Sequence, residues 1–288
     1  MSGPFVAGIA AAVLCALLTN LAFLLKHQGA CSCPPVCFRS PLRSATHLLR
    51  NRVFMAGMAV AIAGFVFHAA AMSLAPLSIV KPVIAGGLVF LAVLAEKRFG
   101  CQVSSRQWIG VGLVGLGLLA MAVTVPAPHE TEEASNSGLL VFEAVLLTVC
   151  LGFAIIPRSR RAKRHTALLF AAATGLLFGA SDVAIKALSE MAPMEILLSP
   201  WLLMCIACAV GAFLLGARSL QLGDAVPTIA TTCVTSNLSA IIGGFVVFGD
   251  PMPNNPLHLA INLGALLMIV MASMLVPAPT RQPEPGAA

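Results

Sequence analysis

Nine long stretches of this chain are apolar and almost free of charge. A helix needs about 20 apolar residues to cross the hydrocarbon core of a bilayer. Only helices and closed barrels satisfy their backbone polar groups there, and long runs without alternation favour helices. The chain is 59% hydrophobic and 10% charged, so it has too little polar surface to cover a water-soluble core. We therefore predict an all-α, polytopic membrane protein.

The lengths of these stretches predict nine transmembrane helices. The third is the shortest, and the eighth is the least apolar because it contains TIATTCVTSNLSA. Splitting the eighth stretch would leave two pieces too short to cross the bilayer. The predicted spans are Pro4–Leu25, Val53–Leu74, Ile79–Ala95, Trp108–Val125, Gly138–Ile156, Ala167–Leu188, Ile196–Leu215, Ala225–Phe248 and Leu257–Val276.

The basic residues predict the orientation of these helices, because short cytoplasmic loops are rich in Lys and Arg. With the N-terminus outside and the C-terminus inside, fifteen of the seventeen basic residues fall on the inner face, and the outer loops hold acidic residues without Lys or Arg. The remaining two, Lys81 and Lys186, lie within spans. We predict an N-out, C-in protein of the cell membrane, plasma or inner. The inner residues are Lys26, Arg39, Arg43, Arg50, Arg52, Lys97, Arg98, Arg106, Arg158, Arg160, Arg161, Lys163, Arg164, Arg218 and Arg281.

Short sequences recur in the same order in the two halves of the chain. MAVTVPAP at the end of the fourth span returns as MASMLVPAP at the end of the ninth, FLAVLAE resembles FVVFGD, and NLAFLLK resembles SDVAIK. Because the fifth span stands between two sets of four, the copies are expected to lie upside down relative to each other, as in the inverted repeats of secondary transporters. The predicted regions are a first repeat at 1–137 with a cytoplasmic loop at 26–52, the fifth span and a basic loop at 138–165, a second repeat at 166–277 and a disordered tail at 278–288.

These segments also resemble a known family. GLLFGASDVAIKAL (Gly175–Leu188) resembles the first helix of an EamA repeat in the drug/metabolite transporter superfamily, and SLAPLSIVKPVIAGGLVFLAVLAEKRFG followed by WIGVGLVGLGLLAMAV resembles its closing helices. The nine spans, the turn LAPLSIVKP and the N-out arrangement look most like the NIPA-type branch, described as magnesium transporters. The chain departs from that branch in the insertion CSCPPVCFRSPLRSATH and in its shorter third helix. The resemblance implies the EamA-like fold and transport activity.

Ionisable residues inside the predicted spans are candidate functional residues, because each costs on the order of 2.5–3.5 kcal/mol to insert. At 1.5 Å per residue, Asp182, His68 and Glu143 each lie roughly 8–9 Å below the outer face. Lys186 follows Asp182 by four residues on the same helical face, and Lys81 lies just inside the third span. We expect these residues to gather at one level of the bundle.

Two interpretations of this group stay open. In the first, Asp182 and Glu143 take up a proton or cation, the two lysines hold an anionic or zwitterionic substrate, and His68 relays protons. In the second, Asp182 and Lys186 neutralise each other one turn apart, the lysines extend to the headgroups, and His68 bonds a backbone carbonyl.

Two asparagines and a cysteine cluster complete the candidates. Asn20 in the first span and Asn237 in the polar run of the eighth either line a cavity or pack helices. The cluster at Cys31, Cys33 and Cys37 faces the cytoplasm in the predicted topology, where disulfides rarely persist, and its spacing matches no common zinc site. We assign no resident metal, and treat these residues as juxtamembrane thiols or sites of palmitoylation.

We expect a transporter that moves a small polar solute by alternating access. Mg²⁺ is the specific candidate, because Asp182 and Glu143 could supply the one or two carboxylates that it uses. The two lysines fit an organic anion or a lipid headgroup better, since like charges 4 Å apart repel by about 4 kcal/mol at an effective dielectric constant of about 20. An alternative from another class is a scaffold or assembly partner that transports nothing. An enzyme is not expected, because the spans contain no nucleophile and base pair.

The expected partners follow from composition and charge. They are the lipid bilayer, the transported ion or small molecule, and anionic lipid at the basic inner loops. A homodimer is compatible with this interpretation. No cofactor is expected, and nucleic acid is excluded because the chain has no Tyr and only two Trp to stack on bases.

Overall fold

The computed structural model describes residues 3–75, 79–80, 83–84, 86–99, scattered positions between 105 and 120, and then 136–155, 163–189, 191–249 and 255–275. All regular structure in these residues is helical, and five of the described helices are long and apolar enough to cross a membrane. The chain is therefore an all-helical, multi-pass membrane protein, as predicted. The helices are α1 (Gly3–Cys31), α2 (Pro41–Arg50), α3 (Arg52–Leu74), α5 (Leu88–Phe99), α7 (Asn136–Ile155), α8 (Lys163–Ser189), α9 (Pro193–Leu198), α10 (Pro200–Leu222), α11 (Ala225–Val247) and α12 (Pro256–Leu275).

The helices α1 and α3 form a tight antiparallel pair. Gly57 of α3 packs against Lys26 of α1, and Gly64 packs against Thr19. The residue number therefore rises along one helix as it falls along the other. Glycines on α3 let the two backbones approach closely, which is how helices associate where no water drives them together.

The helix α8 is central to the second half of the chain. It packs against α10 and α11. Gly175 and Gly179 of α8 face Thr232 and Ser239 of α11, so these two helices run parallel, and a Cβ atom at Gly175 would lie 2.6 Å from the Thr232 carbonyl oxygen. Small residues thus set the spacing of α8 and α11.

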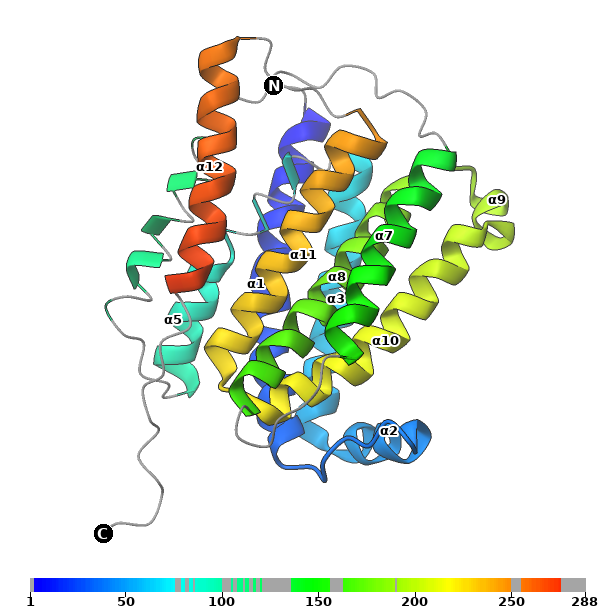
Figure 1. The fold of residues 1–288 in the computed structure, drawn as a ribbon, viewed down its shortest axis with the longest axis vertical. Helices are drawn as coiled ribbons and strands as arrows, with labels where there is room; N and C mark the ends of the chain where they lie inside the picture. The colour runs from blue at the N-terminus through cyan, green and yellow to red at the C-terminus, as the bar shows by residue number, and fades with distance from the viewer. Residues whose placement is uncertain are drawn as a thin grey trace.

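The two halves meet where α3 lies beside α8. His68 bonds Asp182, and Met72 bonds Lys186 one turn further along both helices, so α3 and α8 run parallel. Because α1 is antiparallel to α3, α1 and α8 run in opposite directions (Figure 1). The first helix of each half therefore enters the bundle from the opposite end.

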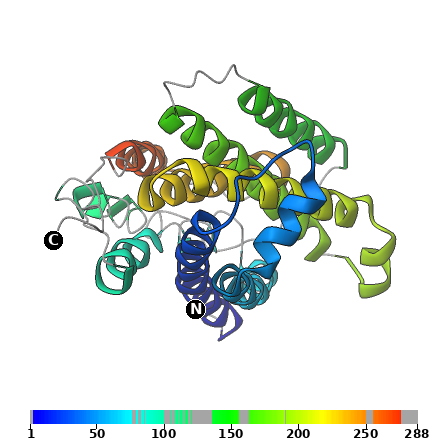
Figure 2. The same cartoon turned by 90° about the horizontal axis from the view of Figure 1, so that it is seen from below.

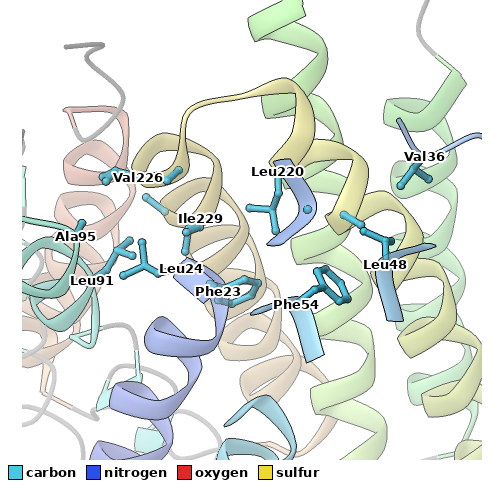
Figure 3. Close-up of a cluster of buried hydrophobic side chains, with 14 of the residues drawn as sticks. Phe23, Leu24, Val36, Leu48, Phe54, Leu91, Ala95, Leu220, Val226 and Ile229 are labelled. Carbon is cyan, nitrogen blue, oxygen red and sulfur yellow. The ribbon is translucent and has the colours of Figure 1, made fainter. Parts of the chain in front are cut away.

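A cluster of buried apolar side chains closes one end of this interface (Figure 3). Phe54 of α3 stacks edge-on against Phe213 of α10, and Phe23 of α1 does the same with Phe178 of α8. Close packing of these side chains connects both halves of the chain. The labelled members of the cluster are Phe23, Leu24, Val36, Leu48, Phe54, Leu91, Ala95, Leu220, Val226 and Ile229.

The prediction of one continuous third span at 79–95 is wrong. Residues 79–80 and 83–84 are helical, Gly86 and Gly87 form a turn, and α5 begins only at Leu88. A glycine pair has little helix propensity, so this is where an apolar helix breaks at low cost. The break brings the Gly87 backbone against Ala16 and Asn20 of α1.

Other predicted boundaries also shift. The seventh span was predicted from Ile196, but Ser199 separates α9 from α10, and the Ser199 hydroxyl accepts a hydrogen bond from Trp201 N at 3.3 Å as the cap of α10. The first span was predicted to end at Leu25, but α1 continues to Cys31 because nothing before Ser32 interrupts the backbone.

The region 26–52 was predicted as a loop, and it contains the unpredicted helix α2. Pro41 occupies the first turn of α2, where its missing N–H is not needed. Asn51 ends α2 and caps α3 by accepting from Val53 N and Phe54 N. Figure 2 shows α2 lying across the end of the bundle.

Several predicted features lie outside the described residues. They include Lys81, most of the fourth span, the MAVTVPAP and MASMLVPAP endings in whole or in part, most of the basic loop at 158–164 and the tail. The predicted spans at 53–74, 225–248 and 257–276 agree closely with α3, α11 and α12.

The spacing of α8 and α11 gives a first prediction. We expect Gly175→Ala to lower the free energy of unfolding by about 1–3 kcal/mol, because the added methyl group collides with the α11 backbone. Thermal unfolding of the detergent-purified protein measures this. In the control Gly152→Ala on α7, the new Cβ meets nothing within 4 Å, so stability should not fall. Equal effects of the two substitutions would contradict the proposed spacing role.

Candidate functional site

A buried pair of hydrogen-bonded side chains joins α3 to α8. His68 Nε2 lies 2.7 Å from Asp182 Oδ1, and both side chains are 9% exposed. The second carboxylate oxygen, Oδ2, accepts a hydrogen bond of 3.2 Å from the Ser236 hydroxyl of α11. On the other side of the ring, Cys15 Sγ of α1 lies 3.8 Å from His68 Nδ1. Four helices therefore contribute to this group.

The pair faces a cavity of about 180 Å³ between the two halves of the chain. The first half contributes α1, α3 and Ile84, and the second half contributes α8 and α11. The polar and ionisable lining residues are Cys15, Thr19, Asn20, Lys26, His68, Asp182, Thr232, Cys233, Ser236 and Asn237.

Asn20 connects the cavity wall to the broken third span. Its Nδ2 donates to Ala16 O at 2.8 Å within α1 and to Gly87 O at 2.9 Å in the turn before α5. Its carbonyl oxygen Oδ1 is buried and has no hydrogen-bond partner among the described residues. The Gly87 carbonyl also accepts from Leu91 N at 3.1 Å, so Asn20 adds a second hydrogen bond that ties α1 to the start of α5.

Lys26 is a cavity residue that the sequence interpretation assigned to the inner loop. It lies within α1, lines the cavity and places Nζ 4.3 Å from the centroid of the Phe23 ring. Its position at the end of an apolar run looked like an ordinary topological charge. The sequence signal that could have revealed it is the continuation of helical residues to Cys31.

The structure separates the predicted site residues into groups. Asp182, His68, Asn20 and Asn237 line this same cavity, and Glu143 and Lys186 are buried but are not part of its lining. Lys186 Nζ donates to Met72 O of α3 at 3.5 Å. Lys81 lies outside the described residues. His68 forms a bond with the Asp182 carboxylate.

The cavity can bind polar groups of both signs. The Asp182 carboxylate, the Ser236 hydroxyl and Asn20 Oδ1 are oxygen ligands of the kind that hard cations prefer. His68 adds an imidazole ring that can donate or accept a hydrogen bond. Lys26 offers a positive charge elsewhere in the same cavity.

The cysteine loop lies away from this cavity. Cys37 is exposed, and the backbone N–H of Arg39 and the hydroxyl of Ser40 lower the pKa of its thiol. Cys33 Sγ donates to His47 O at 3.6 Å. Within the part of the chain that the structure describes, no group of three or more His, Cys, Asp or Glu residues is arranged to hold a metal ion.

Comparison with known proteins shows distant homology to a plant protein. The chain is 24% identical over 274 residues to "Probable magnesium transporter NIPA9" of Arabidopsis thaliana, across 89% of this chain and 78% of the relative. The resemblance to the NIPA-type branch inferred from the sequence is thereby confirmed. No protein-family model matches the chain. No solved structure matches it either.

The contact between His68 and Asp182 predicts energetic coupling. We compare His68→Ala, Asp182→Asn and the double mutant. The loss of unfolding free energy in the double mutant should differ by about 0.5–3 kcal/mol from the sum of the two single losses, because each substitution removes the same contact. Unfolding of the detergent-purified protein by a denaturing surfactant measures this. Thr148→Ala on the exposed face of α7 serves as the control partner for Asp182→Asn and should be additive with it. Additivity in both cycles would show that the pair contributes nothing.

Proposed function

We propose that this chain is a secondary-active carrier that moves a small polar solute across the membrane through the cavity between its two halves. The observation that carries the proposal is the His68–Asp182 pair, which places ionisable groups inside the bundle and facing that cavity. Ionisable residues within membrane spans are costly and mark substrate or ion pathways. The distant homology to a protein named as a probable transporter supports the same conclusion.

The proposed architecture is nine spans in an inverted repeat, N-out and C-in, in the cell membrane. It is supported by the opposite directions of α1 and α8, which open the two halves. It is also supported by the location of the cavity, which lies between elements of both halves. Alternating access would then be a change in how the α1 and α3 pair packs on α8 and α11.

Mg²⁺ is the solute that we favour. The relative is named a probable magnesium transporter, and the oxygen atoms of Asp182, Ser236 and Asn20 are ligands that Mg²⁺ accepts while it keeps several waters. Lys26 does not oppose this, because it lies opposite Gly57, eleven residues from His68 along α3. At 1.5 Å per residue, Gly57 and His68 are about 16 Å apart along α3, so the Lys26 backbone and the Asp182 carboxylate lie at different levels of the bundle.

Lys26 also supports a second candidate, an organic anion or zwitterion. Such a solute would place its negative group near Lys26 and a hydrogen-bond donor or positive group near Asp182. The cation–π contact with Phe23 holds the lysine side chain in place for this role.

Transport through this cavity requires the Asp182 carboxylate. In proteoliposomes loaded with a Mg²⁺ indicator, we expect Asp182→Asn to reduce uptake at least about tenfold, because loss of a charged hydrogen-bonding group costs about 1.5–3 kcal/mol. The control Glu96→Gln replaces an exposed carboxylate of α5 and should transport like the wild type. Unchanged uptake in Asp182→Asn would eliminate the proposed site, and no flux of any tested solute would favour the scaffold alternative.

Substitution of Lys26 distinguishes between the two candidate solutes. If Mg²⁺ is the solute, Lys26→Gln should leave Mg²⁺ uptake equal or higher, since removal of a positive charge favours a cation. If the solute is an organic anion, Mg²⁺ should not be taken up and Lys26→Gln should abolish anion uptake. Uptake of Mg²⁺ and of a panel of labelled organic anions by the same vesicles distinguishes these results.

A further inference from the structure

Glu143 of α7 is a fully buried carboxyl group outside the cavity. Its exposed fraction is 0%. It shares the inward face of α7 with Leu139, Leu146 and Cys150, which follow at helical spacing and are also buried. The opposite face of α7 is apolar and exposed, at Leu140, Val141, Val145 and Val149. An acidic residue therefore sits in the centre of the helix face that packs against the bundle.

The side chains that flank Glu143 on α7 pack among apolar side chains and thiols. Leu146 and Cys150 belong to one buried cluster with Ala180 of α8 and Cys208 of α10. The neighbouring side chain, Phe142, reaches the place where α8 and α11 meet, so that a Cβ atom at Gly243 would lie 3.1 Å from the Phe142 ring. Neither carboxylate oxygen of Glu143 has a hydrogen-bond partner among the described residues.

The titratable groups around Glu143 do not favour a negative charge. They are Asp182 from α8 and Cys205 and Cys208 from α10, and Cys150 lies two turns further along α7 itself. From α11, the Gly243 backbone lies against Phe142, the neighbour of Glu143. The nearby basic groups are His68 of α3, which is bonded to Asp182, and Lys186 of α8, which donates to the Met72 carbonyl; neither forms a hydrogen bond with the Glu143 oxygens. A buried carboxyl group in such surroundings is stable only with its proton.

We propose that Glu143 is a proton-binding site, separate from the solute cavity, that holds its proton while α7 packs on α8 and releases it to water when that contact opens. The proposal rests on the proposed transport function, because opening of the contact is a step of alternating access. The helix α8 connects the two sites, since it carries Asp182 toward the cavity and packs against α7. Movement of α8 during transport would therefore change the surroundings of Glu143. The ligand of this site is H⁺ and not the solute.

Infrared spectroscopy of the purified full-length protein tests protonation without any transport assay. At neutral pH we expect the C=O stretching band of a protonated carboxyl group, lost in Glu143→Gln and retained in the control Glu96→Gln. Should the glutamine variant fail to fold, titration of the wild type to alkaline pH should remove the same band. A wild type without the band, or a folded Glu143→Gln variant that keeps the whole of it, overturns the proposal.

Proteoliposomes test the link to transport. We expect wild-type Mg²⁺ uptake to change with an imposed pH gradient, and Glu143→Gln to take up Mg²⁺ at one rate with or without that gradient, because glutamine mimics a permanently protonated group. Glu96→Gln should respond as the wild type does. A Glu143→Gln variant that still responds to the gradient overturns the link. If the wild type takes up no Mg²⁺, the proposed substrate fails while the infrared result still decides the protonation of Glu143.

Discussion

The low dielectric of the membrane interior requires that Asp182 have a partner, and this requirement organises the structure. An unpaired carboxylate inside the bundle is costly. The partner, His68, comes from the other half of the chain, so the two halves are joined at one defined level. The same register brings Lys186 to the Met72 carbonyl. One electrostatic constraint thus sets how α3 and α8 align and where the cavity between them lies.

Much of the helical framework could be predicted, because insertion into a bilayer leaves a strong signal in the sequence. Long apolar runs gave the ends of α3, α11 and α12 closely. Other helix ends differ from the predicted ones because of local backbone preferences. The helix α1 continues through polar residues to Cys31, and the glycine pair before Leu88 interrupts an otherwise apolar run. Hydropathy does not register either effect, since it measures side-chain transfer and not the preference of the backbone for a helix.

The candidate site was predictable in its chemistry but not in its pairing. The cost of insertion singled out Asp182, His68 and Glu143. Which of them share a cavity depends on how each helix is rotated about its axis in the bundle. Tertiary packing determines that rotation. Glu143 faces the α8 and α10 side, whereas Asp182 faces α3 and α11. Lys26 was missed because a lysine at the end of an apolar run serves equally well as a topological charge and as a cavity residue.

The hydrogen bond from Asn20 to Gly87 has a consequence for how the start of α5 can move. The Gly87 carbonyl accepts from Leu91 N at 3.1 Å in the first turn of α5 and from Asn20 Nδ2 of α1 at 2.9 Å. Asn20 and the turn before α5 are therefore coupled, although they are far apart in the sequence. A shift of α1 along its axis must carry the first turn of α5 with it or break this bond.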